Sequence, residues 1–327
     1  MNDTAWLGHA LIALFDHTVL SIMRWTVLFR FPKVTARYLI LKDQTWPPNP
    51  VLPKTVNDKY FWRKVFDRNP EFPVICDKLQ VGDWMRRHGA DVASAQVLWT
   101  GTDPGDIPES LWRPGGILKA NHGSGWNVVL QDPMPDKDAV YARARYFMKT
   151  QYGSQWYERF YFDVDRKLFI EEFLPDLRLE MKFYTFGSDV QRVFVRYFPA
   201  ADARADVWRL DENGKLYLTG EKSSSAKIVA NQPVPPVAEE ALAAARLIGE
   251  NFDHMRVDFL SDGERFWVGE LTICNLGGHI DGMKAESAAR LNAAWDIRKS
   301  WFLTSPQSGW RRFYKAILLR RLNARSA

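Results

Sequence analysis

The central part of the chain contains a succession of strand-like segments with turns, rather than helices, between them. Lys167–Leu174 and Leu179–Phe186 have the apolar and aromatic composition of strands, and the segments RVFVRYF and KLYLTG follow them. Turn-forming residues at Gly187-Ser188-Asp189 and Asn213-Gly214 separate these segments. Because parallel strands need long crossovers, such hairpin-like runs predict an α+β fold with mainly antiparallel sheets.

Helices are predicted before and after these strands in the sequence. The alanine-rich segment Pro236–Asn251 is typical of a helix, Ala139–Tyr157 has helical composition, and another helix is predicted from about Cys76 to Arg87. The apolar segments HMRVDFL and RFWVGELTI are predicted to be two strands joined by the turn Ser261-Asp262-Gly263.

Size and charge narrow the class of protein. With 327 residues, 46% of them hydrophobic, the chain can bury one large core or two to three coupled subdomains. The net charge of +5 is modest and dispersed, so nucleic acid is not an expected partner. Cys76 and Cys274 are the two cysteines, far apart in sequence, which predicts neither a disulfide framework nor a CxxC metal site. A reducing, cytoplasmic location is expected.

Both ends of the chain contain amphipathic helical sequence. The apolar run from Trp6 to Phe31 lacks the features of a secretory signal and is interrupted by charged residues, which favours a docked or interfacial helix over a membrane span. The segment WRRFYKAILLRR, from Trp310 to Arg321, interleaves basic and apolar residues. Such a helix can lie on an anionic membrane surface, and it can equally pack on its own domain with a solvated basic face.

A lysine and a glycine loop form the first candidate site. Lys119 ends an apolar strand and precedes Gly123-Ser124-Gly125 by four residues. Backbone N–H groups of a glycine loop can close over phosphate oxygens, and a neighbouring lysine adds positive charge to the same oxygens. Because the lysine precedes the glycines, this is no Walker A loop. Taken alone, the pattern also suits an ordinary hairpin loop beside a surface lysine.

Acidic residues in the predicted strands form the other candidate sites. Asp258 and Glu270 are expected on adjacent strands, with Arg256 on the same face as Asp258. Two such carboxylates can bind Mg²⁺, or one of them can form a cross-strand ion pair with the arginine. In Phe169–Pro175, two acids interrupt an apolar strand, which suits either an edge strand or a carboxylate that accepts from an adenine amino group. Lys182 lies among aromatic residues and either snorkels or faces an anion.

These pieces, in this order, resemble the ATP-grasp superfamily and its TupA-like branch, named for a teichuronopeptide biosynthesis protein. The similarity runs from about Pro53 to Gly282 through LPKTVNDKYFWRKVFDRNP, CDKLQV, LKANHGSGWN, FIEEFLPD, LEMKFYTFG, FDHMRVDF and WVGELT. It implies an ATP-grasp fold, in which two α+β subdomains with mainly antiparallel sheets sandwich ATP, here with an added N-terminal helical segment.

The resemblance also implies roles for individual residues. The implied nucleotide-binding set consists of Lys119, His122, Gly123, Ser124, Gly125, Glu171, Glu172, Phe173 and Leu174. Within it, Lys119 contacts the phosphates beneath the glycine flap. Glu171 accepts from the adenine amino group, and Glu172 to Leu174 form the hinge. At His122, a structural imidazole is preferred over a catalytic one. Arg256 and Lys182 are the implied catalytic residues. Asp258 and Glu270 bind magnesium, with Asn275 or water supplementing Thr272, which replaces the asparagine common in the superfamily.

The resemblance further suggests a division of the chain and a reaction. Residues 1–52 are predicted to form the N-terminal helix and connector, 53–115 an N-terminal α/β subdomain, 116–175 the small subdomain, 176–300 the large subdomain and 301–327 the basic C-terminal helix. The implied activity is an Mg-ATP-dependent ligation of a carboxylate to an amine through an acyl-phosphate, in the synthesis of surface polysaccharides or glycoconjugates. A kinase-like phosphotransferase acting on a sugar and a non-catalytic nucleotide-binding partner of glycosyltransferases are the alternatives. The expected location is the cytoplasm, with peripheral membrane contact through the terminal helices.

Overall fold

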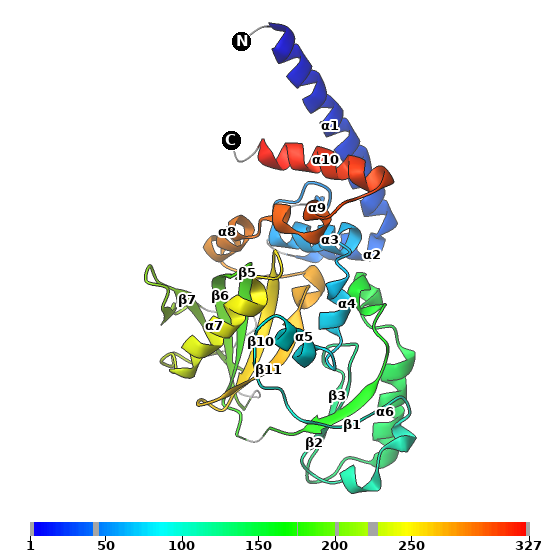
Figure 1. Cartoon of the computed structure of the whole chain (residues 1–327), viewed down its shortest axis with the longest axis vertical. Coiled ribbons are helices and arrows are strands. Elements are labelled where there is room, and N and C mark those ends of the chain that lie inside the picture. Colours follow the sequence, from blue (N-terminus) through cyan, green and yellow to red (C-terminus); the bar gives the residue numbers. More distant parts are fainter. Residues whose placement is uncertain (1–2, 42–45, 175, 200–202, 222–227, 325–327) are drawn as a thin grey trace. The chain divides into compact units, whose positions relative to one another are not determined.

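The computed structural model describes residues 3–41, 46–174, 176–199, 203–221 and 228–324 (Figure 1). The chain divides into two compact units, each built from separate stretches of sequence. The first comprises Met1–Asn69, Gln155–Tyr157 and Leu276–Ala327, and the second comprises Pro70–Ser154 and Glu158–Asn275. The five-part division of the sequence stays a prediction.

The first unit is helical in its described residues. Its elements are α1 (Asp3–Arg30), α2 (Pro32–Arg37), η1 (Tyr38–Ile40), α3 (Val56–Phe66), α8 (Ala285–Ala294), η8 (Ile297–Lys299), α9 (Trp301–Thr304) and α10 (Gly309–Asn323). The 3₁₀ turns η4 (Ser154–Trp156) and η7 (Asn275–Gly278) fall at the sequence boundaries of the units. Thr55 caps α3 by accepting from the Asp58 N–H, and the buried Trp62 of α3 donates to the Tyr314 hydroxyl at 3.0 Å.

The second unit contains two antiparallel sheets, which confirms the predicted α+β class. The smaller sheet has the order β1-β4-β2-β3 and comprises β1 (Val97–Gly101), β2 (Gly116–Ala120), β3 (Asn127–Leu130) and β4 (Leu168–Glu172). The larger has the order β11-β10-β5-β6-β7-β8 and comprises β5 (Leu179–Phe186), β6 (Asp189–Tyr197), β7 (Arg204–Leu210), β8 (Leu216–Leu218), β10 (Met255–Ser261) and β11 (Phe266–Thr272). The short β9 (Ile228–Val229) pairs with β7 in parallel.

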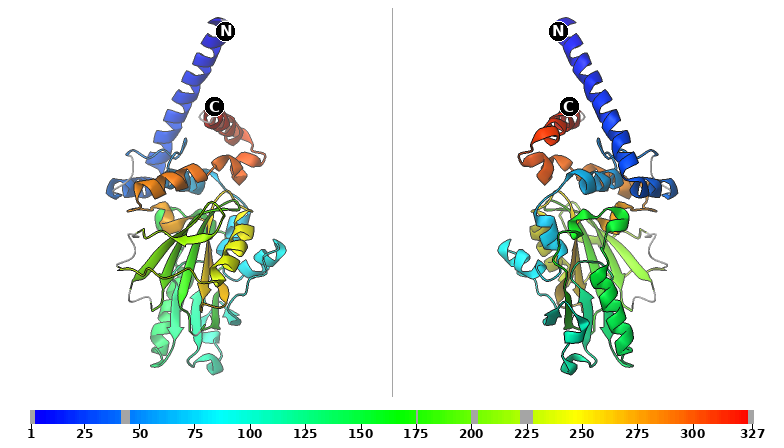
Figure 2. Two further views of the ribbon diagram at one scale, coloured as in Figure 1. Left: turned by 90° about the vertical axis from the view of Figure 1, so that its left-hand side faces the viewer. Right: turned by 90° about the vertical axis from the view of Figure 1, so that its right-hand side faces the viewer.

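Helices and 3₁₀ turns complete the second unit. They are α4 (Glu71–Cys76), α5 (Val81–Arg87), η2 (Pro104–Asp106), η3 (Glu109–Leu111), α6 (Lys137–Lys149), η5 (Arg159–Tyr161) and α7 (Val237–Gly249). Figure 2 shows α7 along the larger sheet, where Gly249 lies against Thr185.

Two predicted helices are wrong in their extent. The helix predicted from about Cys76 to Arg87 begins only at Val81, because the Asp77 carboxylate accepts from the backbone N–H of Leu79 and closes a turn between α4 and α5. The helix predicted to reach Tyr157 ends at Lys149, where Thr150 adopts an extended conformation, and the positive φ angles of Gly153 and Tyr157 prevent a right-handed helix from continuing to Tyr157.

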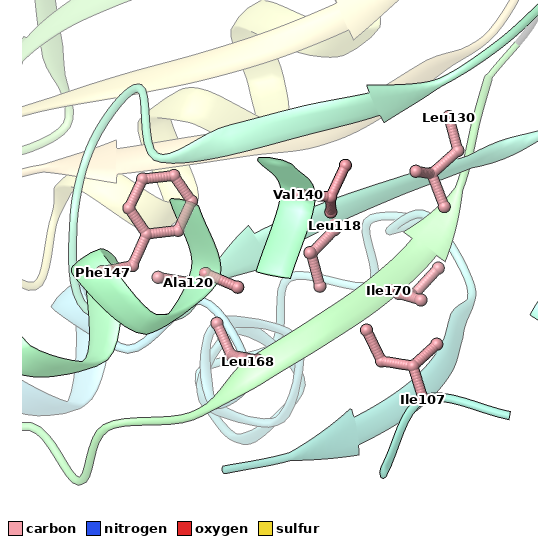
Figure 3. Packing of buried hydrophobic residues seen from close by; sticks show 9 residues of the cluster. Ile107, Leu118, Ala120, Leu130, Val140, Phe147, Leu168 and Ile170 are labelled. Atoms are coloured by element: carbon pink, nitrogen blue, oxygen red, sulfur yellow. The ribbon is translucent and has the colours of Figure 1, made fainter. Parts of the chain in front are cut away.

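Alternation along the small sheet separates a packed face from a polar face. Leu118 and Ala120 of β2 and Leu168 and Ile170 of β4 pack in a cluster with residues of α6 (Figure 3). Because successive side chains of a strand point to opposite faces, Lys119 and the β4 residues Phe169 and Glu171 lie on the face away from this cluster. The core of the small sheet thereby fixes the orientation of the polar residues.

Candidate functional site

The second unit contains a cavity of about 160 Å³ that is lined by the segment between α4 and α5 and by residues of β2, β4 and β11, among others. The segment between α4 and α5 contributes Lys78, the small sheet contributes Lys119 and Glu171, and β11 contributes Glu270. Leu174, which follows β4, completes this set. Four of these five residues were predicted as site residues from the sequence, and Lys78 was not.

Lys119 and Glu171 form an ion pair on the polar face of the small sheet. The Lys119 Nζ contacts the Glu171 Oε1, and the two side chains keep 19% and 17% of their exposure. β2 and β4 are neighbours, and their register places Glu171 two positions along from the residue opposite Lys119. A long lysine side chain bridges that diagonal separation.

Lys78 is the residue that the sequence interpretation missed. Its ammonium donates to the Gly123 carbonyl, so it connects the cavity to the glycine loop. Burial lowers the pKa of the Lys78 amino group, while the negative charge of Glu270 acts in the opposite direction. A lysine between α4 and α5 therefore adds a second positive charge to the cavity beside Lys119.

Asn121 explains how the separate segments come together. Its fully buried side chain donates to the Asp77 carboxylate at 2.9 Å and accepts from the backbone N–H of Lys167 at 2.8 Å. Its backbone carbonyl accepts from the Lys78 N–H at 3.2 Å. One asparagine thus connects the end of β2 to the turn that carries Lys78 and to the start of β4.

The glycine loop has a defined conformation. Gly125 has a φ of +71°, which favours glycine, and a Cβ on Gly123 would lie 3.0–3.2 Å from ring atoms of Tyr152 and Trp126. The Tyr152 hydroxyl hydrogen-bonds Ser124, and burial raises the pKa of Tyr152 to about 12. Gly123, Ser124 and Gly125 do not line the cavity themselves.

His122 lies beneath this loop. The imidazole is fully buried, with Nδ1 3.0 Å from the Asn121 Oδ1 and Nε2 3.1 Å from the Phe147 carbonyl. Burial lowers the pKa of His122, so the neutral ring is favoured. Both ring nitrogens face acceptor oxygens, and the neutral imidazole donates to one of them, so this buried ring supports the loop rather than binding a ligand.

The segment after β4 is held by backbone hydrogen bonds. Glu172 makes two hydrogen bonds to Gln96. Its carboxylate accepts from the Gln96 N–H at 2.9 Å, and its backbone N–H donates to the Gln96 carbonyl at 2.9 Å. The Phe173 N–H donates to the Gly115 carbonyl at 2.8 Å. Pro175, the end of the predicted hinge motif, lies outside the described residues.

Strand register assembles the second group of predicted residues on the larger sheet. Asp258 of β10 is opposite Lys182 of β5 on one side and Glu270 of β11 on the other. Arg256, two residues earlier on β10, is opposite Thr272. Directly opposed residues share a face, so all five point the same way, and a bulge follows Asp258 in the β10–β11 pairing.

Arg256 and Lys182 both bind Asp258. The guanidinium contacts the carboxylate twice, with Nε 2.6 Å from Oδ1 and Nη2 2.7 Å from Oδ2, and the Lys182 Nζ is 2.8 Å from Oδ2. Burial would raise the pKa of Asp258, but the two cations outweigh it and lower the pKa. Burial likewise acts to lower the pKa of Lys182, and Asp258 raises it above its ordinary value. Asp258 is therefore a buried, ionised carboxylate.

The remaining oxygen atoms of this group face the same guanidinium. The Asn275 Oδ1 accepts from Arg256 Nη1, the Thr272 Oγ1 accepts from Nη2 at 3.1 Å, and the Glu270 Oε2 is 3.7 Å from Nη2. Asn275 also donates to the Tyr184 hydroxyl at 2.9 Å. Asn275 and Thr272 are thus both adjacent to the two carboxylates.

The donor set suits a hard cation only after a rearrangement. Carboxylate, amide and hydroxyl oxygens are the ligands that Mg²⁺ takes. Among the residues that the structure describes, no three His, Cys, Asp or Glu side chains form a ready metal cluster. Both oxygens of Asp258 already accept from cations, whereas Glu270 lines the cavity with a single long contact. Glu270 would therefore be available to hold a metal as it stands, and Asp258 would be available only after release by Arg256 or Lys182.

Comparison with known families identifies the fold. The model of the TupA-like ATP-grasp family matches residues 58–292, most of the chain, and the protein belongs to that family. The resemblance noted from the motifs is thereby confirmed. No curated protein is significantly similar to the chain in sequence.

Several solved ATP-grasp structures are similar to the structure of this chain at low sequence identity. D-alanine–D-alanine ligase from Bacillus anthracis, complexed with ATP, is 14% identical over 68% of this chain and 65% of that one, with a TM-score of 0.39. The corresponding ligase from Helicobacter pylori is 10% identical over 75% and 70%, with a TM-score of 0.42. The ATP-grasp ligase PsnB, complexed with minimal precursor, Mg and ADP, is 14% identical over 75% and 58%, with a TM-score of 0.31. This chain spans less than two thirds of the B. anthracis ligase and of PsnB.

Proposed function

We propose that this protein is a Mg-ATP-dependent ligase that joins a carboxylate to an amine through an acyl-phosphate. Membership of the TupA-like ATP-grasp family supports this activity. The observation that carries it is the cavity of the second unit, in which two lysines and two glutamates from four stretches of chain converge. Phosphoryl transfer depends mainly on positioning and charge neutralisation, which such a cavity provides.

In this proposal the small sheet binds the nucleotide. Lys119 and Lys78 neutralise phosphate oxygens, and ATP binding opens the Lys119–Glu171 pair so that Glu171 accepts from the adenine amino group. The segment from Glu172 to Leu174 forms the hinge beside the ring. The loop Gly123-Ser124-Gly125, fixed to Lys78 at its first residue, closes over the phosphates.

The larger sheet then provides the residues for the transfer. The substrate carboxylate attacks the γ-phosphorus, which gives ADP and an acyl-phosphate, and the amine attacks the acyl carbon and releases inorganic phosphate. Arg256 and Lys182 neutralise negative charge on the transferring group. Glu270 and Asp258, with Asn275 or Thr272, would hold Mg²⁺, which would neutralise phosphate charge.

We propose that the reaction takes place in the cytoplasm, where ATP is available, in the synthesis of a surface polysaccharide or glycoconjugate. The acid is a small molecule or is linked to a glycan, the other substrate is an amine, and nucleic acid is not a partner. The apolar α1 and the basic α10 support contact with the inner face of the membrane.

A thermal unfolding experiment tests the nucleotide site. Mg-ATP at a hundred times its dissociation constant should stabilise the wild type by about 2.7 kcal/mol. Lys119→Ala should lose this stabilisation. Lys137→Ala should keep it, because Lys137 also pairs with a glutamate but is exposed on α6 and lies outside the cavity. Equal responses of the two variants to Mg-ATP would reject the site.

The ligase reaction is tested by ADP release. Purified protein is supplied with Mg-ATP and with amino acids and uronic acids, each alone and in pairs. A ligase should release ADP and phosphate in proportion to a condensed product only when both an acid and an amine are present. ADP formed with a phosphorylated sugar from a single acceptor would instead establish a kinase-like phosphotransferase and overturn the proposal.

A further inference from the structure

α1 has apolar residues on two opposite faces. On one face Leu20, Val27 and Leu28 are buried in the first unit, and Asp16 is also buried there. On the other face lies an apolar stripe, which we call the outer stripe, whose side chains are 49–78% exposed; it consists of Leu11, Leu14, Phe15, Ile22, Trp25 and Phe29. Its members recur at spacings of three or four residues except between Phe15 and Ile22, where the exposed Thr18 occupies the position on the stripe. A helix of a water-soluble domain ordinarily has charged or polar residues on its outward face. An outward face on which the large side chains are apolar over five turns indicates contact with another apolar phase.

Basic side chains lie beside this stripe. α10 contains five basic residues and no acidic one, and the ring of its Phe313 meets Phe15 of the outer stripe at 6.2 Å between centroids. Arg312 of α10 is exposed, as are Arg30 at the C-terminal end of α1 and Lys33 of α2. An apolar stripe flanked by exposed cations is complementary to a bilayer with anionic headgroups.

The same cations argue against a second copy of the chain as the occupant. In a twofold interface the same surface contacts itself. Arg30, Lys33 and Arg312 would then share an interface with the same three cations of the second copy, and like charges across an interface oppose association. Anionic lipid is favoured by both the apolar and the charged residues.

Contacts of Asp16 determine how the helix lies in the bilayer. The segment Ala10–Arg30 is long and apolar enough to cross a membrane, with a mean hydropathy of 1.4. However, the buried Asp16 carboxylate pairs with Arg320 of α10, with Oδ1 2.6 Å from Nη2 and Oδ2 3.2 Å from Nε. A spanning α1 would break this pair and move an aspartate into hydrocarbon, which is unfavourable.

We infer that the outer stripe inserts into the boundary between headgroups and acyl chains of an anionic membrane, with α1 parallel to the membrane plane and still docked on α10. The opposite face of α1 stays on the first unit, and Arg30, Lys33 and Arg312 contact the lipid headgroups.

Co-sedimentation of the full-length protein with vesicles tests this surface. The protein should bind phosphatidylcholine vesicles containing phosphatidylglycerol, bind pure phosphatidylcholine far more weakly, and be released partly by high salt. Ile22→Ser/Phe29→Ser should weaken binding about tenfold or more, because two apolar anchors are lost. Ala10→Ser/His17→Ser, at two exposed positions of α1 outside the stripe, should bind like the wild type.

Two results would overturn the surface assignment. One is equal binding of the stripe variant and the control variant to anionic vesicles. The other is absence of vesicle binding together with a dimer, seen by sedimentation velocity, that dissociates in the stripe variant. Vesicle binding needs no nucleotide, so failure here leaves the proposed ligase activity untouched.

Depth measurements separate a helix that lies on the membrane from one that crosses it. Leu11→Cys, Ile22→Cys and Phe29→Cys are labelled singly with a fluorophore, while the native Cys76 and Cys274 are buried. Lipids with spin labels at known depths then quench the fluorophore. A helix in the membrane plane should give the same shallow depth at all three positions. A label at Ile22 near the bilayer centre, with Leu11 and Phe29 shallow, would establish a span and overturn the inferred orientation.

Discussion

The two sheets of the second unit each present a lysine paired with a carboxylate, and the two pairs are built differently. Lys119 and Glu171 each have the other as their ion-pair partner and keep 19% and 17% of their side-chain exposure. Asp258 is 2% exposed and binds two cations, Lys182 and Arg256. The small-sheet pair is simple and lines the cavity, whereas the large-sheet group is a buried network.

The difference indicates which pair a ligand can open. A partly exposed pair contributes little to stability, since water solvates both partners after separation. A buried carboxylate held by two cations is different, because removing one member leaves uncompensated charge in a poorly solvated place. A ligand can therefore displace Glu171 from Lys119 at small cost, while the Asp258 network keeps the larger sheet in a fixed arrangement.

Asp258→Ala should give the largest loss of stability. It leaves Arg256 and Lys182 as buried cations without their shared carboxylate, which should lower the free energy of unfolding by about 3–5 kcal/mol. Denaturant unfolding followed by circular dichroism measures this loss. Glu264→Ala, on the exposed turn of the same hairpin, is the control and should change stability by less than about 0.5 kcal/mol. Similar midpoints for the two variants would contradict the network.

Acidification should reduce the difference in unfolding free energy between the wild type and Asp258→Ala. Because the folded pKa of Asp258 is lowered, the stability that its charge contributes is present above the unfolded pKa of about 3.9. It is lost as the pH falls through the lowered folded pKa. The gap in unfolding free energy should stay constant between pH 7 and pH 5 and narrow below about pH 4. A gap that narrows already between pH 7 and pH 5 would show that another group is responsible.

Lys182→Met should have a smaller effect than Asp258→Ala and a larger one than Lys119→Met. Removing Lys182 also removes its contact to Glu180, while Asp258 keeps both contacts to Arg256, so the expected loss is that of a hydrogen bond to a charged group, about 1.5–3 kcal/mol. Lys119→Met removes an equivalent charge from a partly exposed pair and should cost less than about 1 kcal/mol. Both are measured by the same denaturant unfolding. Equal losses would mean that the deeper burial of Asp258, 2% exposed against 17% for Glu171, does not distinguish the two pairs.

Local sequence patterns predict the members of both pairs, whereas the other site residues depend on long-range contacts. Alternation along the strands was enough to place Arg256 and Asp258 on one face, and hairpin turns were enough to predict antiparallel sheets. Lys78 and Asn121 could not be found in this way. Asn121 acts by contacts to Asp77 and Lys167, which are 44 and 46 residues away, and nothing in its own segment signals them. The available sequence signal was the Asp77-Lys78 dipeptide at a predicted helix start. The position of Lys78, however, is set by the turn between α4 and α5.

The smallest expected effect is the coupling between Lys119 and Glu171, and it bears most directly on the nucleotide site. A double-mutant cycle with Lys119→Met, Glu171→Gln and the double variant isolates the pair from other contacts of each residue. Without nucleotide, the coupling in unfolding free energy should be below about 1 kcal/mol, since both side chains are partly exposed. If ATP separates the two residues, repeating the cycle with saturating Mg-ATP should change this coupling, because each residue then has its own part of the nucleotide as partner. A large coupling that is the same with and without Mg-ATP would mean that the pair is a fixed structural element, and the contrast with the Asp258 network would fail.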